Sequence, residues 1–174
     1  LVTIFDLLGQ DFINTILYAS AIILVLLFVL QRSPVRGLVV FTPMFLGLIW
    51  LWGTMGWFGI KVSVATAGLG AIVLGLGVEY GVFMLTRYRE ERERRGDKEE
   101  ALKAAVSSVG AAITGSGTTT IVGFLALTLS ILPLLQNLGF SLALGIFYSL
   151  AAAVLVEPLV IIMKERLALR RWGK

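Results

Sequence analysis

An acid, a phenol and a run of hydroxyls in apolar surroundings are the residues of this chain whose chemistry is most distinctive. Glu79 and Tyr80 interrupt the apolar stretch VLGLGVEYGVFML, and Thr118, Thr119 and Thr120 follow one another in TGSGTTT. Desolvation disfavours a charged carboxylate, and hydroxyls can donate to its charged form or accept from its neutral form. These five residues therefore predict a proton relay.

Two further polar residues, Ser116 and Glu157, are secondary candidates. Ser116 belongs to the threonine run, and Glu157 precedes Pro158. Because a proline leaves a helical carbonyl free, Glu157 also has a purely structural interpretation as a local polar group. Glu79 in turn can be interpreted as a permanently protonated acid that is hydrogen-bonded between helices. Threonines in a span can also bond back to their own helix or hold two helices together.

The composition argues against an enzyme and in favour of a membrane protein. The 174 residues contain no cysteine and no histidine, which removes thiolate chemistry and the commonest metal ligand and general base. We therefore expect no catalysis, no metal ion and no other cofactor. Hydrophobic residues make up 57% of the chain, against about 45–50% in soluble domains, and the mean hydropathy is +0.91.

Five apolar runs must position the polar residues. A bilayer core of about 30 Å takes roughly 20 residues of helix, and backbone groups in lipid must be satisfied within the segment. We therefore expect an all-α membrane protein, a bundle of five transmembrane helices. The runs cover residues 12–31, 38–58, 62–88, 111–132 and 140–163.

The basic residues predict how the bundle is oriented. If successive connections alternate sides, every Lys and Arg except Lys61 falls on one side of the membrane. The positive-inside rule places that side in the cytoplasm, with residue 1 external and residue 174 cytoplasmic in the cell membrane. Topology thus explains the net charge of +4, and no nucleic-acid partner is expected.

The connection between the third and fourth spans, RYREERERRGDKEEALKAAVSSVG, is densely charged. Its residues Ala101, Leu102, Ala105 and Val106 form an apolar stripe at helical spacing. We expect a cytoplasmic amphipathic helix on the membrane surface. A regulatory or partner-docking segment is the alternative.

The polar groups of three spans reach a similar depth. Glu79 precedes Arg87 by eight residues, about 12 Å at 1.5 Å per residue, and Glu157 precedes Lys164 by about 10 Å. A mid-membrane acid costs about 2.5–3.5 kcal/mol on insertion scales, so it normally faces a protein interior or a water cavity. We therefore expect Glu79 inside the bundle.

Gly77 and Gly81, at GxxxG spacing, predict close helix packing. Such packing would bring Glu79 within reach of hydroxyls on a neighbouring span.

Two segments together resemble a known family. GLGVEYGVFMLTRYREE and the later ITGSGTTTIVGFLAL are similar to the fourth and fifth membrane helices of a resistance-nodulation-division (RND) transporter half, particularly MMPL-like exporters and sterol-sensing domains. The resemblance implies that Glu79-Tyr80 matches the Asp-Tyr or Asp-Asp pair that relays protons in this family. Thr118–Thr120 with Gly123-Phe124 match the family's hydroxyl-rich segment, and Pro158 matches a proline late in its sixth helix.

The resemblance also implies what surrounds this chain. The five spans correspond to helices 2–6 of a half, residues 1–11 to the tail of an external domain, and a second half completes the transporter. The chain is thus expected to be part of a longer polypeptide, and the resemblance implies that this polypeptide can form an oligomer. Glu in place of Asp lengthens the relay side chain by one methylene.

The implied function is proton-coupled export of lipidic or hydrophobic molecules, with the bilayer, protons and such a substrate as partners. Two alternatives stay open. A sterol-sensing-like module would bind lipid or report on it without transport, and a scaffold subunit would use the polar layer only to hold helices together.

Overall fold

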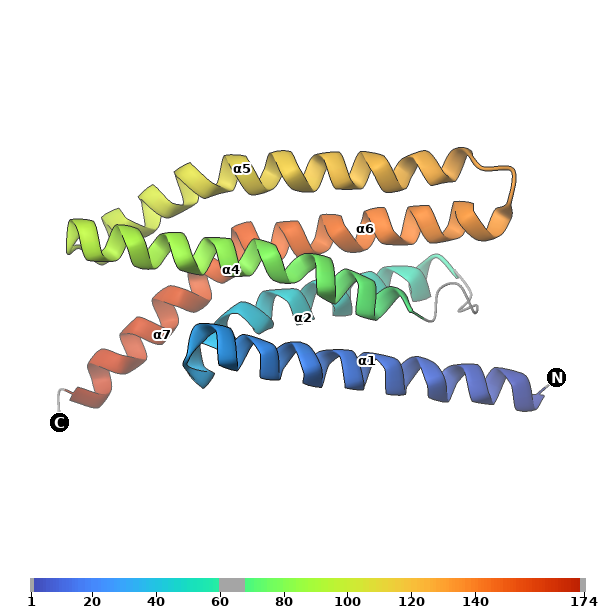
Figure 1. Cartoon of the computed structure of the whole chain (residues 1–174), viewed down its shortest axis with the longest axis horizontal. Coiled ribbons are helices and arrows are strands. Elements are labelled where there is room, and N and C mark those ends of the chain that lie inside the picture. The colour runs from blue at the N-terminus through green and yellow to red at the C-terminus, as the bar shows by residue number, and fades with distance from the viewer. Residues whose placement is uncertain (1, 60–67, 173–174) are drawn as a thin grey trace.

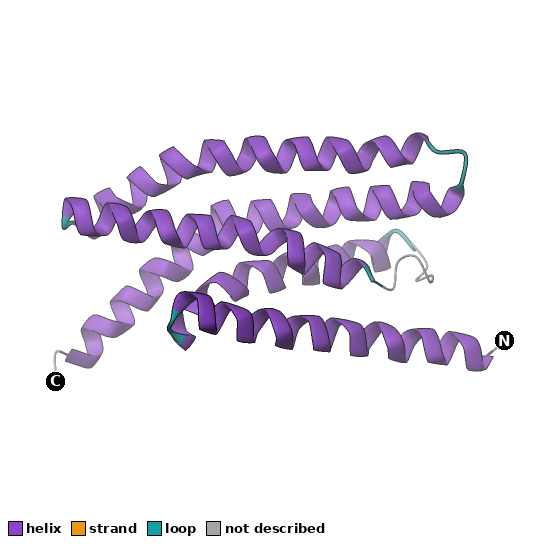
Figure 2. Cartoon of the chain, in the orientation of Figure 1, coloured by secondary structure: helices purple, strands orange, loops and turns teal. Residues whose placement is uncertain are grey.

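The computed structural model describes residues 2–59 and 68–172, with side chains at Gln10 and through residues 13–59 and 68–164. Helices joined by short loops make up this part of the chain (Figure 2). The long helices are α1 (Val2–Gln31), α2 (Pro34–Trp57), α4 (Leu69–Arg95), α5 (Lys98–Ala126), α6 (Pro133–Leu155) and α7 (Glu157–Trp172), and the short 3-10 helix η1 (Leu127–Leu129) follows α5.

Five helical segments are long and apolar enough to cross a membrane, which confirms the predicted all-α bundle of five spans. The last of them combines α6 with the first half of α7. The segments are Ile13–Gln31, Pro34–Trp57, Leu69–Arg95, Lys98–Leu129 and Pro133–Lys164.

The spans run side by side, with α6 packed against α2, α4 and α5, and with α1 packed against α2 and α4 (Figure 1). The N-terminus lies at one end of the bundle, and the C-terminus, the α1–α2 turn and the α4–α5 hairpin lie at the other. The basic residues of that turn and hairpin are thus gathered at one end. This arrangement supports the predicted orientation in the membrane, which stays a prediction.

Small residues allow α2, α4 and α6 to approach one another closely at Ser149. A Cβ atom placed on Gly47 of α2 would lie 3.0 Å from the Ser149 Cα and N atoms. One placed on Gly77 of α4 would lie 3.1 Å from the Ser149 Oγ. Glycine at these positions lets the three backbones meet, which is how helices gain packing contacts in lipid.

The charged connection is helical but does not form a separate helix on the membrane surface. Its first half extends α4 to Arg95, and its second half begins α5 at Lys98. Backbone hydrogen bonding continues through charged residues, and ion pairs between residues three and four positions apart support it. The helix ends at Gly96, whose φ of 75° suits a residue without a Cβ.

The other helix ends also differ from the hydropathy boundaries. α2 begins at Pro34, because Ser33 is extended (φ −162°) and proline is well suited to the first helical turn. The last span is divided between α6 and α7, because Pro158 cannot donate a backbone hydrogen bond. Residues 2–11 form the first turns of α1, and their assignment to an external domain stays a prediction. The predicted start of the third span, 62–67, and Lys61 lie outside the described residues.

Candidate functional site

Tyr80 of α4 lies in the seam between α4 and α5 and packs against α6. Its side chain is 1% exposed and belongs to an apolar cluster with Ile113 of α5 and Ile146 and Leu150 of α6. Among the described residues, its buried hydroxyl makes no hydrogen bond of acceptable geometry. A buried hydroxyl without a partner is costly and rare in proteins, so it requires an explanation, and a functional role is one.

Glu79 lies on the outer surface of the chain, and not in its interior as expected. Helical geometry explains this position, because Glu79 is about 160–200° around the helix axis from Gly77 and Gly81. Those two glycines face Ser149 of α6 and Val40 of α2. The close packing that they permit therefore turns Glu79 away from the bundle centre.

The relay candidates nevertheless adjoin one another at this seam. Glu79 directly precedes Tyr80 in α4, and the Thr120 side chain of α5 lies close to the Tyr80 hydroxyl. Thr120 comes from the facing surface of α5 and is half-buried. The structure thus brings together Glu79, Tyr80 and Thr120, one acid and two hydroxyls on two helices.

The threonine hydroxyls bond to their own helix. Thr118 donates to the carbonyl of Thr114 at 2.7 Å, and Thr119 and Thr120 donate to that of Ser116 at 2.7 and 3.0 Å. Their protons are thereby engaged, while their oxygens remain acceptors. The side chains of Thr118 and Thr119 are exposed, so Thr120 is the one turned toward Tyr80.

A cavity of about 450 Å³ between α4 and α5 joins the seam to the charged hairpin. Tyr80 and Ser116 line it together with Arg87 and Glu90. Ser116, the secondary hydroxyl candidate, therefore shares a cavity with Tyr80. The cavity links the buried phenol to a region rich in ionisable groups.

The hairpin end of this seam is held by charged contacts. The Glu91 carboxylate, 4% exposed, accepts from Arg95 at 2.7 Å and pairs with Arg87 at 2.9 Å. Asp97 caps α5 by accepting from the backbone N–H groups of Glu99 and Glu100, both at 2.9 Å. These backbone hydrogen bonds, that of Glu100 first, lower the pKa of Asp97 below its ordinary value.

Glu157, the other secondary candidate, is fully buried where α6 meets α7. Its Oε2 lies 3.2 Å from the point that a Cβ atom on Gly81 would occupy. It therefore belongs to the α2–α4–α7 side of the bundle, away from the α4–α5 seam.

The prediction from sequence did not single out Ser149. Its buried hydroxyl lies between Gly47 and Gly77 and has no hydrogen bond among the described residues. The signal that could have revealed it is the four-residue spacing of the small residues Gly145 and Ser149 in α6, which is typical of helix interfaces in membranes.

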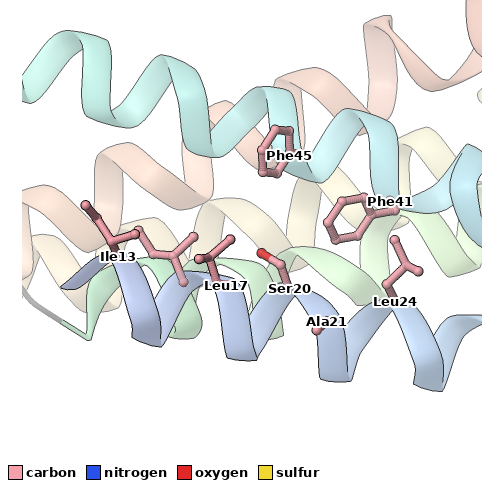
Figure 3. A pocket seen from close by; sticks show the side chains of 8 residues that line it. Ile13, Leu17, Ser20, Ala21, Leu24, Phe41 and Phe45 are labelled. Carbon is pink, nitrogen blue, oxygen red and sulfur yellow. The ribbon is translucent and has the colours of Figure 1, made fainter. Parts of the chain in front are cut away.

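A second hollow is an apolar groove between α1 and α2, with a volume of about 480 Å³ (Figure 3). Phe41 and Phe45 project from α2 toward Leu17, Ser20 and other residues of α1. Ser20 is the polar residue among those that line it. The full lining consists of Ile13, Ile16, Leu17, Ser20, Ala21, Leu24, Phe41 and Phe45.

Among the side chains that the structure describes, at Gln10 and within 13–59 and 68–164, no group of acidic residues is arranged to hold a metal ion. Five spanning helices with a polar seam define a multi-span membrane protein. The chain belongs to the MMPL family, whose model matches residues 3–173. This match confirms the resemblance to MMPL-like members of the RND superfamily.

Several relatives show how much of a longer protein this chain represents. The membrane protein MJ1562 of Methanocaldococcus jannaschii is 38% identical over 83% of this chain and 37% of its own length. MmpL12 of Mycobacterium tuberculosis, named a probable transport protein, is 31% identical over 99% of this chain and 15% of its own. The siderophore exporter MmpL5 of the same species is 28% identical over 83% of this chain and 16% of its own length.

The chain thus spans well under half the length of these relatives. No solved structure matches the chain significantly.

Proposed function

We propose that the chain is the membrane portion of a proton-coupled RND-type exporter of lipidic or hydrophobic molecules. The observation that carries this proposal is the grouping of Glu79, Tyr80 and Thr120 beside a cavity that leads to Arg87 and Glu90. A proton relay requires an acid and hydroxyl groups that lie next to one another in space. It also requires a path to ionisable groups, which the cavity provides at the hairpin end of the bundle.

The outward position of Glu79 fits a role at a boundary with another part of the whole protein. A carboxylate facing lipid at mid-membrane costs about 2.5–3.5 kcal/mol on insertion scales. The chain covers only 15% of MmpL12, so much of such a relative lies beyond it. We infer that a further membrane segment, the second half of the transporter, covers Glu79.

In this mechanism Glu79 takes up a proton on the side of α4 that the second half of the transporter covers. Tyr80 lies between Glu79 and Thr120 and connects the two residues. Because the Thr120 hydroxyl already donates to the Ser116 carbonyl, its oxygen is oriented to accept a hydrogen bond from the Tyr80 hydroxyl. Protonation then favours one of two helix arrangements. The free-energy difference between the arrangements can change only by as much as the binding free energy of the proton differs between them. The membrane potential supplies about 2.3 kcal/mol per charge for each 100 mV.

The substrate class follows from the family and the bilayer setting. One relative is named a siderophore exporter, and hydrophobic or lipidic molecules partition into the membrane where these helices lie. The orientation proposed is residue 1 outside and residue 174 in the cytoplasm, with the charged hairpin also cytoplasmic.

Transport by the whole protein in proteoliposomes, with and without a proton gradient, tests this function. Glu79→Gln keeps the size of the side chain but cannot carry a proton, so gradient-dependent export should be lost. Glu93→Gln, on the exposed surface of the hairpin, is the matched control and should leave export intact. Undiminished export by Glu79→Gln would contradict the proposal.

A lipid-binding module without transport is the second candidate, and the groove between α1 and α2 favours it. Its apolar walls and its volume of about 480 Å³ suit a lipid chain or a sterol. Replacing Ala21 with Trp would fill the groove without touching the α4–α5 seam. Under this candidate, Ala21→Trp reduces binding of a photoreactive lipid probe, whereas Glu79→Gln leaves both the binding and the biological activity unchanged.

A further inference from the structure

Glu157 occupies the joint between two helices. α6 ends at Leu155, the Val156 N–H still bonds to the Ala152 carbonyl at 2.8 Å, and α7 begins at Glu157. Pro158 carries no N–H, so it cannot complete the helical bond to the carbonyl four residues earlier. In Figure 1, α7 leaves the line of α6 at this point. The joint is a place where the two helices can change their relative direction.

The Glu157 side chain is enclosed by its neighbours. It is 0% exposed, and neither carboxyl oxygen has a hydrogen-bond partner among the described residues. A Cβ atom placed on Gly81 of α4 would lie 3.2 Å from its Oε2 and 3.0 Å from Cγ1 of Val40 in α2. The carboxyl therefore fills the space that Gly81 leaves open between α2, α4 and α7.

Nothing in the described part of the chain compensates a charge at this position. Among the described side chains, no ion pair and no hydrogen bond reaches the Glu157 carboxyl. α6 carries no Asp, Glu, Lys or Arg, and its titratable residue is Tyr148. The titratable and charged groups of the other packed helices are Arg36 of α2; Glu79, Tyr80, Tyr88 and the hairpin charges beginning with Arg87 in α4; and Lys164 on α7 itself.

An unpaired carboxylate without hydrogen bonds is far more costly to bury than a neutral carboxyl. The observed packing therefore accommodates the protonated form, whereas the ionised form needs water or a partner. Neither can reach Glu157 while α7 rests against Gly81. Ionisation and separation of α7 from α4 are consequently coupled.

We propose that Glu157 is a second proton-binding site of the bundle, and that loss of its proton opens the joint between α6 and α7. The O–H bond of the carboxyl breaks, and the proton passes to water that enters as α7 moves away from Gly81. This site is independent of a relay at Glu79, because the two acids lie on different sides of α4. Since Gly81 directly follows Tyr80, movement at the joint acts on the same helix that carries the relay candidates.

Infrared difference spectra of the whole protein in lipid, recorded as the pH is raised, test proton binding directly. A carbonyl band of a protonated carboxyl is expected at neutral pH and should disappear at higher pH. The band should be absent in Glu157→Gln and retained in Glu79→Gln, so the result does not depend on the relay. If Glu157→Gln removes no such band, Glu157 holds no proton and the proposal is overturned.

Spin labels test the movement. The chain has no cysteine of its own, so cysteines can be introduced at Met163 of α7 and Phe83 of α4, both exposed, in a whole protein without other cysteines. The distance between the labels should increase over the pH range in which the carboxyl band is lost. Glu157→Gln should abolish the increase, while Ser149→Ala, which alters a buried hydroxyl that does not titrate, should preserve it. A distance that stays constant while the band disappears would overturn the opening of the joint.

Discussion

The Nε of Arg87 in α4 donates a hydrogen bond to Oγ of Ser108 in α5, at 3.2 Å. The same guanidinium pairs with Glu90 and Glu91 at 2.9 Å and lines the cavity that reaches Tyr80. The charged hairpin and the polar seam therefore meet at one side chain. A proton that travels along this seam would pass the Arg87 ion pairs on the hairpin side.

The Arg87–Ser108 contact should make a small contribution to the stability of the hairpin. Ser108→Ala should raise hydrogen exchange near the hairpin by no more than about fivefold, because exposed charged contacts contribute about 1 kcal/mol or less. Ser107→Ala is the control, since Ser107 bonds to its own helix at the Ala104 carbonyl. Equal effects of the two variants, measured by mass spectrometry, would show that the interhelical contact contributes nothing.

Close packing at Ser149 predicts a contrast between two glycines of α2. Gly47→Ala would place a Cβ atom 3.0 Å from backbone atoms of Ser149, and overpacking of this kind costs about 1–3 kcal/mol. Gly53→Ala meets nothing within 4 Å, so it should be neutral or should stabilise the helix. Thermal unfolding in detergent, followed by circular dichroism, measures both. A Gly47→Ala protein as stable as Gly53→Ala would contradict the observed helix approach.

Asp97 should make the start of α5 sensitive to acid. Because hydrogen bonds from Glu100 and Glu99 lower its folded pKa, its stabilising effect is complete above the unfolded value. That effect is lost as the pH falls through the lower folded value. Asp97→Asn retains a capping side chain but should remove this pH dependence. Hydrogen exchange of residues 98–102 across the acid range measures it, and an identical acid response in Asp97→Asn would exclude Asp97 as the cause.

Thr120 and Thr119 should differ in their effect on proton-coupled transport. Thr120 lies beside Tyr80, and the proposed relay requires their hydroxyls to form a hydrogen bond as the proton moves. Because such an interhelical bond in a membrane contributes about 0.6 kcal/mol, Thr120→Val should slow transport by about threefold. Thr119 is exposed and bonds within its own helix, so Thr119→Val should leave the rate unchanged. Initial rates in proteoliposomes compare the two, and the reverse order would exclude Thr120 from the relay.

Hydropathy was sufficient to predict the five spans, but it could not locate the ends of the helices. Apolar composition reports the preference of side chains for lipid, whereas a helix continues as long as its backbone bonds are made. α4 therefore runs on to Arg95, and α5 begins at Lys98, far before the predicted residue 111. Local chemistry marks the true ends, such as proline at 34 and glycine at 96.

Depth along a helix could be predicted from the sequence, but direction around it was misjudged. Counting residues from the charges placed Glu79 and Glu157 at similar depths, yet Glu79 is exposed and Glu157 is fully buried. The glycine pair at 77 and 81 marks the packed face of α4, and Glu79 lies opposite that face. For Glu157, burial depends on its contacts with Gly81 and Val40, which lie far away in the chain.

Proton flux through the whole protein tests most directly whether Glu79 and Tyr80 form a relay. Vesicles that contain the protein and a trapped pH indicator are given a membrane potential in the presence of substrate, and the rate of acidification is recorded. Glu79→Gln should reduce the flux by about 100-fold or to the level of empty vesicles, as expected for loss of an essential proton carrier, while Glu79→Asp should retain it. A Glu79→Gln protein that conducts protons at the unaltered rate would contradict the proposed relay.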